Sequence, residues 1–140
     1  MALDLGEQRI GVAVSDESET LASPLTVIRR ESRAQLLAAL ESLTAQERVG
    51  KIVIGQTLTR SGEIDQQSRL READARAIAE RIALPVERWD EHLSTQSVER
   101  LLAGRRRKRG PPIDAVVAAL LLQEYLDASP RRPTDDSAHE

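Results

Sequence analysis

The sequence predicts an α/β fold: a mixed five-stranded sheet, with a three-strand antiparallel meander plus two parallel strands, flanked by helices. Three β-rich segments open the chain before any helical pattern, and consecutive segments of this kind pair as a meander. Two later apolar segments are each reached through a helical pattern, which favours parallel addition by crossover connections. The length of 140 residues suits one domain.

The opening strands are expected at 2–5, 9–14 and 25–28. Gly6 stops the first strand, and residues 6–8 are typical of a hairpin turn. The first two strands are therefore expected to pair directly, with the third beside them.

The middle of the chain alternates helices and strands. Ser32 has the side chain of a helix N-cap, and leucines recur behind it at helical spacing until Gly50. Residues 51–54 form a compact apolar run, which is the pattern of a strand buried on both faces. A second helix is expected over 66–83 and a further strand at 86–89.

The last third of the chain is expected to be helical and then disordered. Ser94 or Thr95 can cap a short helix, and a basic loop follows at 104–112. The final helix has apolar residues at helical spacing, namely Ile113, Val116, Val117, Leu120, Leu121 and Tyr125. Residues 128–140 combine prolines with polar residues, which predicts a disordered tail after a domain spanning 1–127.

Composition excludes several classes of protein. With 31% charged and 40% apolar residues and a net charge of −3, the chain is typical of a globular protein rather than a disordered one. The lack of cysteine excludes disulfide scaffolds, thiolate zinc sites and cysteine nucleophiles. No apolar run reaches the ~18–20 residues that span a bilayer. Asp4 interrupts the apolar start that a signal peptide needs, so we expect a cytoplasmic protein without a membrane partner.

One segment concentrates positive charge on an otherwise acidic chain. It consists of Arg105, Arg106, Arg107, Lys108 and Arg109. A local cluster of this kind indicates contact with a polyanion such as nucleic acid. The alternative is a solvated charge run in a surface loop.

Three acidic positions stand out by where they fall. Asp4 lies at the carboxyl end of the first predicted strand, and Asp114 lies in the first turn of the final helix. Asp90 and Glu91 directly follow the last predicted strand. The carboxyl ends of strands form the usual ligand crevice of an open α/β sheet. Carboxylates gathered there repel one another, and Mg²⁺ or Mn²⁺, which prefer oxygen ligands, relieve that repulsion.

Such a carboxylate cluster is suited to phosphodiester hydrolysis. Two divalent ions about 4 Å apart can activate a water and stabilise the departing oxygen. Each acid also has a structural explanation: Asp114 suits the positive end of a helix, and Asp4 suits the turn at Gly6. Asp90 and Glu91 can cap the following helix. From the residues alone, both interpretations stay open.

Several segments occur together in the order typical of one family. The most specific are DLGEQRIGVAVSD at 4–16 and DEHLST at 90–95. They are accompanied by ASPL at 22–25, VIG at 53–55 leading to Gly62, and Ile113-Asp114 followed by Ala118-Ala119. Over about residues 1–127 the chain resembles the YqgF family, also called RuvX, whose members are RNase H-like proteins related to the Holliday junction resolvase RuvC. The resemblance implies an RNase H-like fold and a nuclease.

The resemblance also implies roles for single residues. Asp4, Glu91 and Asp114 match the three acids of the family, which implies that they are catalytic and bind Mg²⁺ or Mn²⁺. The expected contacts to nucleic acid come from Arg9, Ser94, Thr95, Arg105, Arg106, Arg107, Lys108 and Arg109. The structural alternatives are a surface salt bridge for Arg9 and helix capping for Ser94 and Thr95.

Three functions are compatible with these residues. The first is a metal-dependent endonuclease that processes the 5′ end of pre-16S rRNA, as the resemblance implies for bacterial members. The second is a Holliday junction resolvase-like nuclease acting on branched DNA. The third is a non-catalytic nucleic-acid-binding factor in ribosome assembly. RNA or DNA as substrate, and a monomer or homodimer as the working form, are left open.

The chain departs from the family pattern at three places. His92 stands where the family usually has arginine, and Gln56-Thr57 replaces the usual Leu-Pro. Only three residues precede Asp4, where the family commonly has a longer first strand. This short lead-in raises the hypothesis that Met1 is an internal start.

Overall fold

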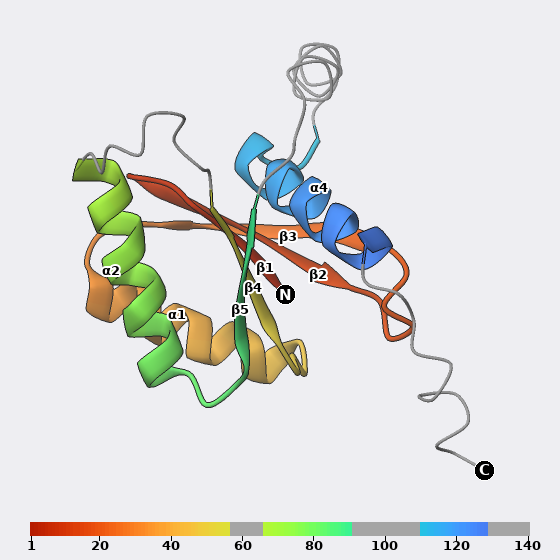
Figure 1. The fold of residues 1–140 in the computed structure, drawn as a ribbon, viewed down its shortest axis with the longest axis horizontal. Helices are drawn as coiled ribbons and strands as arrows, with labels where there is room; N and C mark the ends of the chain where they lie inside the picture. Colours follow the sequence, from red (N-terminus) through yellow and green to blue (C-terminus); the bar gives the residue numbers. More distant parts are fainter. Residues whose placement is uncertain (57–65, 91–109, 129–140) are drawn as a thin grey trace.

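A computed structural model describes residues 1–56, 66–90 and 110–128 (Figure 1). Its elements are β1 (Ala2–Leu5), β2 (Arg9–Ser15), β3 (Ala22–Arg29), α1 (Arg33–Gln46), β4 (Ile52–Gln56), α2 (Gln66–Arg81), β5 (Val86–Asp90) and α4 (Ile113–Ala128). The strands form one five-stranded sheet in the order β3-β2-β1-β4-β5.

The sheet is mixed, as predicted. β1 pairs antiparallel with β2, and β2 with β3, whereas β1–β4 and β4–β5 are parallel. The opening meander therefore lies on one side of β1 and the two later strands on the other. α1 and α2 cover one face of the sheet and α4 covers the opposite face (Figure 1).

The edge strand β3 is longer than expected, since it begins at Ala22 rather than at Leu25. Pro24 lies inside the strand opposite Ala13, where the register shifts next to Val12. A proline is tolerated there because an edge strand has one side that forms no ladder hydrogen bonds. Ser23 and Pro24, which precede the predicted strand, are therefore part of the sheet.

α1 begins as predicted and ends earlier. The Oγ atom of Ser32 accepts a hydrogen bond from the backbone N–H of Gln35 at 3.1 Å. The helix stops at Gln46, and Arg48 has a φ of 52°, in the left-handed region that turns the chain away. Gly50 lies beyond this turn and does not terminate the helix.

Two apolar cores flank the sheet. The larger core, under α1 and α2, is centred on Leu3, Ile10, Val12, Leu36, Leu40, Ile52, Ile54 and Ile78. The smaller core, under α4, contains Ala2, Ala13, Val53, Ala118, Ala119, Leu121 and Leu122. Because successive residues of a strand face opposite sides, β1 directs Leu3 and Leu5 into the larger core and Asp4 toward the α4 side.

α4 packs through a different face from the one that its larger side chains suggested. Its buried residues are Ala115, Ala118, Ala119, Leu121 and Leu122. Of the predicted stripe only Leu121 is fully buried; Val116, Val117 and Leu120 remain partly exposed. Apart from Asp114, residues 113–122 of this helix are all apolar, so periodicity does not select one face. The small alanines let the helix lie close to the sheet.

α4 approaches the sheet very closely at Gly11 on β2. A Cβ atom on Gly11 would lie 1.9 Å from the backbone oxygen of Asp114 and 2.4 Å from its carbonyl carbon. No side chain fits in that space without moving the helix. The first turn of α4 therefore rests directly on the backbone of β2.

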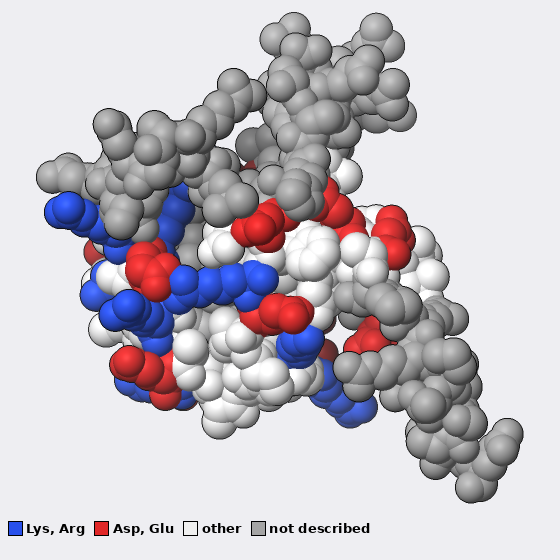
Figure 2. Space-filling model, viewed as in Figure 1, with Lys and Arg blue, Asp and Glu red and all other residues white. Residues whose placement is uncertain are grey.

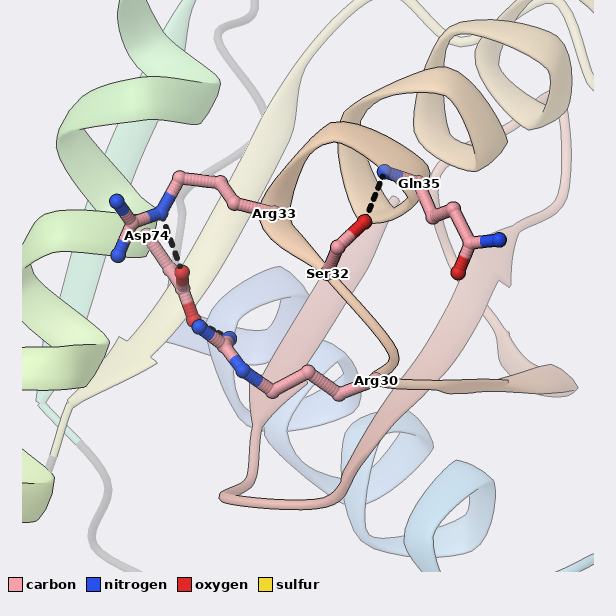
Figure 3. A network of polar contacts seen from close by, with 5 residues as sticks. All are labelled: Arg30, Ser32, Arg33, Gln35 and Asp74. Atoms are coloured by element: carbon pink, nitrogen blue, oxygen red, sulfur yellow. Dashed lines mark hydrogen bonds and ion pairs between the residues drawn. The ribbon is translucent and has the colours of Figure 1, made fainter.

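A buried carboxylate connects the two helices of the larger core. Among the described residues, Asp74 on α2 is the one fully buried charged side chain, at 1% exposure. Figure 3 shows two arginines converging on it, Arg30 just after β3 and Arg33 at the start of α1. The Nε atom of Arg33 donates to Oδ1 of Asp74 at 3.0 Å, and Arg30 donates to Oδ2. The network joins α2 to the turn between β3 and α1.

The two aromatic side chains of the protein, Trp89 on β5 and Tyr125 on α4, are in contact. The rings of Trp89 and Tyr125 are edge to face, with centroids 5.3 Å apart. The indole N–H of Trp89 donates to Glu124 at 3.1 Å, and Lys51 Nζ donates to the Tyr125 hydroxyl at 2.6 Å. This hydrogen bond is the main reason that the pKa of Lys51 is raised.

Three sequence-based expectations lie outside the described residues. They are the short helix after Ser94, most of the basic loop, and the tail, since α4 ends at Ala128. Within the part of the chain that the structure describes, every helix is too short or too polar to cross a membrane.

We expect the Gly11→Ala substitution to lower the free energy of unfolding by about 3 kcal/mol or more, because α4 must move to admit one methyl group. Gly50→Ala is the matched control, since its added Cβ meets nothing within 4 Å. Urea unfolding of both variants measures the difference. Equal losses at the two positions would contradict the close packing at Gly11.

We expect Asp74→Asn to cost about 3 kcal/mol of stability, because it leaves two arginine side chains without their buried carboxylate. Glu80→Gln, an exposed change on the same helix, should cost no more than about 0.5 kcal/mol. Thermal unfolding monitored by circular dichroism compares the two. A melting temperature for Asp74→Asn within error of the Glu80→Gln value would show that the network does not stabilise the fold.

Candidate functional site

Two of the three predicted acids come together through Gly11. In the β1–β2 ladder Asp4 is the direct partner of Gly11. The backbone of Asp114 lies against the same glycine from the α4 side, the side to which Asp4 points. Asp4 and Asp114 therefore share one face of the sheet, near the carboxyl end of β1 and the amino end of α4.

Arg9 lies next to Asp114 on the same face of the sheet. Its Nε atom lies 3.4 Å from Oδ2 of Asp114, and the side chains of Arg9 and Asp114 are 65% and 30% exposed. The surface salt bridge, one of the two alternatives for Arg9, is thus present. An exposed ion pair of this kind contributes little to stability. Arg9 can therefore exchange Asp114 for another anion at low cost.

Asp90 lies on the other side of the sheet. It ends β5 opposite Gln56, the last residue of β4, and Oδ1 of Asp90 accepts a hydrogen bond from Nε2 of Gln56 at 2.7 Å. By strand alternation these two side chains face α2, whereas Trp89 faces α4. Asp90 is therefore held by a structural hydrogen bond and is not part of the group around Asp4.

The donors at this face fit a hard divalent cation. Asp4 and Asp114 both supply carboxylate oxygen, the ligand type that Mg²⁺ and Mn²⁺ prefer, and both side chains are only partly buried. Within the described ranges no group of three or more acidic or histidine side chains could hold a metal ion. The third predicted acid, Glu91, lies outside those ranges.

The other predicted contacts to nucleic acid also lie outside the described residues. They are Ser94, Thr95, Arg105, Arg106, Arg107, Lys108 and Arg109. Of the residues expected at the site, the structure places Asp4, Arg9 and Asp114 and brings them together.

A second group of basic residues was not singled out in the sequence. Figure 2 shows Lys and Arg side chains gathered over α2, whereas the charged side chains visible along α4 are Asp and Glu. α2 carries four arginines, Arg69, Arg71, Arg76 and Arg81, while α4 has no basic residue. The signal was the density of arginine in this helix, which is less conspicuous than the uninterrupted basic run.

In sequence the chain matches one family over nearly its whole length. A family model described as "RuvX: Holliday junction resolvase" matches residues 1–128. A relative from Symbiobacterium thermophilum is 41% identical and covers 95% of this chain and 94% of its own length. A relative from Chloroflexus aurantiacus is 36% identical over 100% of this chain and 92% of its own. Both carry the name "Putative pre-16S rRNA nuclease".

The solved structures agree on the fold. The chain is similar to Thermus thermophilus RuvC in complex with a Holliday junction substrate, with a TM-score of 0.57 at 16% sequence identity. The match covers 90% of this chain and 92% of that one. At this identity the likeness confirms the RNase H-like fold and nothing finer. The family match over residues 1–128 and the relative at 41% identity show that the chain belongs to the RuvX family.

Proposed function

We propose that this protein is a metal-dependent endonuclease that hydrolyses phosphodiester bonds at the 5′ end of pre-16S rRNA. The observation that carries the proposal is the meeting of Asp4 and Asp114 on either side of Gly11. Asp4 on the central strand and Asp114 in the first turn of α4 are thus two acidic residues on the same face of the sheet, and a divalent cation stabilises neighbouring carboxylates.

The chain's own residues have distinct tasks in this proposal. Asp4 and Asp114 hold Mg²⁺ or Mn²⁺, and Glu91 completes the set of ligands. The bound cation supplies Lewis acidity, which favours attack by water and stabilises the departing oxygen. Arg9, exposed and next to Asp114, contacts a phosphate of the substrate beside the cleaved bond.

The basic run after Gly104 holds the substrate backbone. Contacts from Arg105 to Arg109 to phosphates contribute affinity without sequence selectivity. Ser94 and Thr95 add hydroxyl contacts to phosphate. A protein that processes rRNA in this way works in the cytoplasm.

The substrate is inferred from the curated relatives, whose names specify pre-16S rRNA. The family description and the RuvC complex instead name the Holliday junction. The cleavage assay therefore compares precursor rRNA, a four-way DNA junction and plain duplexes. Preferred cleavage of the junction would replace the rRNA substrate with branched DNA and leave the site unchanged.

We expect Asp4→Asn and Asp114→Asn each to lower the cleavage rate in Mg²⁺ or Mn²⁺ by at least about a hundredfold, because each removes a charge at the site where the reaction develops charge. Asp127→Asn is the matched control, since Asp127 is an exposed carboxylate near the other end of α4. Chelation with EDTA should abolish cleavage by the unaltered protein.

Binding measurements with the same variants identify the alternative. Tight, salt-sensitive binding of nucleic acid without cleavage by the unaltered protein would support the non-catalytic ribosome-assembly factor. Full cleavage by Asp4→Asn would show that the reaction centre lies elsewhere.

We expect Arg9→Gln to have two opposite effects. Removing one phosphate contact should weaken nucleic-acid binding and reduce the slope of log affinity against log salt by about 1. Removing the cation that pairs with Asp114 should lower the Mg²⁺ concentration needed for half-maximal cleavage. Arg81→Gln, an exposed arginine at the end of α2, should leave the Mg²⁺ dependence unchanged. An unchanged Mg²⁺ requirement in Arg9→Gln would show that the ion pair does not compete with the metal.

A further inference from the structure

A cavity of about 150 Å³ opens on the α2 side of the sheet, opposite the candidate metal site. It is lined by Leu5, Ile54, Gly55, Gln56, Arg71, Glu72, Ala75 and Arg88. These residues come from the carboxyl ends of β1 and β4, from β5 and from α2. The pairing between β1 and β4 ends at Leu3 and Ile54, whereas the pairing between β4 and β5 continues to Gln56 and Asp90. The cavity therefore lies where β1 and β4 no longer pair.

The cavity combines an apolar floor with a polar rim. Leu5, Ile54 and Ala75 are almost fully buried and provide the floor. The rim has guanidinium groups from Arg71 and Arg88 and hydrogen-bonding groups from Gln56 and Glu72. A cavity of about this volume accommodates one benzene-sized ring. A flat, single ring with polar edges therefore matches both the size and the chemistry.

The charges of the rim do not favour a free phosphate. Arg88 is already paired with Glu72. The guanidinium of Arg88 holds the pKa of the Glu72 carboxyl below its usual range, so Glu72 is ionised at neutral pH. Arg71 is the cation of the rim with no ion pair to another described residue. One guanidinium without an ion pair to a described residue, beside an apolar floor, is poorly suited to a doubly charged anion but well suited to stacking on a neutral ring.

The rim also offers hydrogen bonds of both kinds. The Nε2 atom of Gln56 is used by Asp90, and within the described residues its Oε1 atom accepts no hydrogen bond. The amide oxygen and the Glu72 carboxylate can accept from exocyclic amino or ring N–H groups, and the guanidinium groups can donate to ring carbonyls. Unstacked bases are recognised in this way, by stacking on arginine planes and by hydrogen bonds to their edges.

We propose that this cavity binds one unstacked nucleobase of the nucleic acid that the protein cleaves, with Arg71 stacked on the ring and Gln56 and Glu72 on its edge. The proposal rests on the proposed function, because it assigns a base of that substrate. Asp4 and Leu5 are neighbours on β1 that face opposite sides of the sheet, so one strand end separates the cavity from the candidate metal site. A single strand passing over this edge can place a phosphate on one side and a nearby base on the other.

The test measures binding of short single-stranded RNA oligonucleotides in EDTA, so that cleavage does not interfere. One abasic position is moved along a fluorescently labelled oligonucleotide, and affinity is read from fluorescence anisotropy. We expect one position at which loss of the base weakens binding by about fivefold or more, the scale of one lost stacking contact. Losing a base elsewhere should have little effect.

Three variants assign that effect to the cavity. Arg71→Ala should remove the position-specific loss, and Arg71→Lys should remove it too, because lysine keeps the charge and lacks the planar group. Arg69→Ala makes the same change of charge on the same helix at an exposed position outside the cavity and should retain the loss. Melting temperatures of the three variants establish that they are folded.

Different failures point to different proposals. If all abasic positions weaken binding by the unaltered protein equally, the inference that the cavity binds a nucleobase is wrong. It is also wrong if Arg71→Lys keeps the position-specific loss. Neither result would contradict the proposed nuclease activity. Retained position dependence in both Arg71→Lys and Arg71→Ala would place the base-binding contact outside this cavity. Absence of any RNA binding by the unaltered protein would overturn both this inference and the rRNA substrate on which it rests.

Discussion

The contact between Gly11 and the first turn of α4 is the constraint on which the site depends. Because β2 has no side chain at this position, the helix lies on the strand backbone and Asp114 is placed beside the partner residue of Gly11 in the ladder, Asp4. The buried alanines of α4 let the rest of the helix pack against the sheet. The position of Asp114 relative to Asp4 is thus determined by small residues that carry no functional group themselves.

The two faces of the sheet carry different charges. On the α4 side, the described charges around the start of the helix are acidic except for Arg9. On the α2 side, arginines are numerous, and two of them are committed to the buried Asp74. The acidic face suits a cation and the arginine-rich face suits a polyanion, so a substrate strand crossing the carboxyl edge of β1 would meet both.

The strands, the capped first helix and the positions of Asp4 and Asp114 could be predicted because local patterns determine them. The buried face of α4 could not, since residues 113–122 of that helix are apolar except for Asp114 and the choice of face depends on close packing against Gly11. The Asp74 network and the Gln56–Asp90 hydrogen bond join residues far apart in sequence, and no periodicity signals such pairs. The meeting of Asp4 with Asp114 depended on the family resemblance as well as on strand position.

The lone tryptophan of the chain has an experimental consequence. Trp89 on β5 lies edge to face with Tyr125 and hydrogen-bonds Glu124, so its environment is built largely from α4. Detachment of that helix would expose the indole to water and shift its emission to longer wavelength. Intrinsic fluorescence of the unlabelled protein therefore reports on the seating of α4, the same element that carries Asp114 to the site.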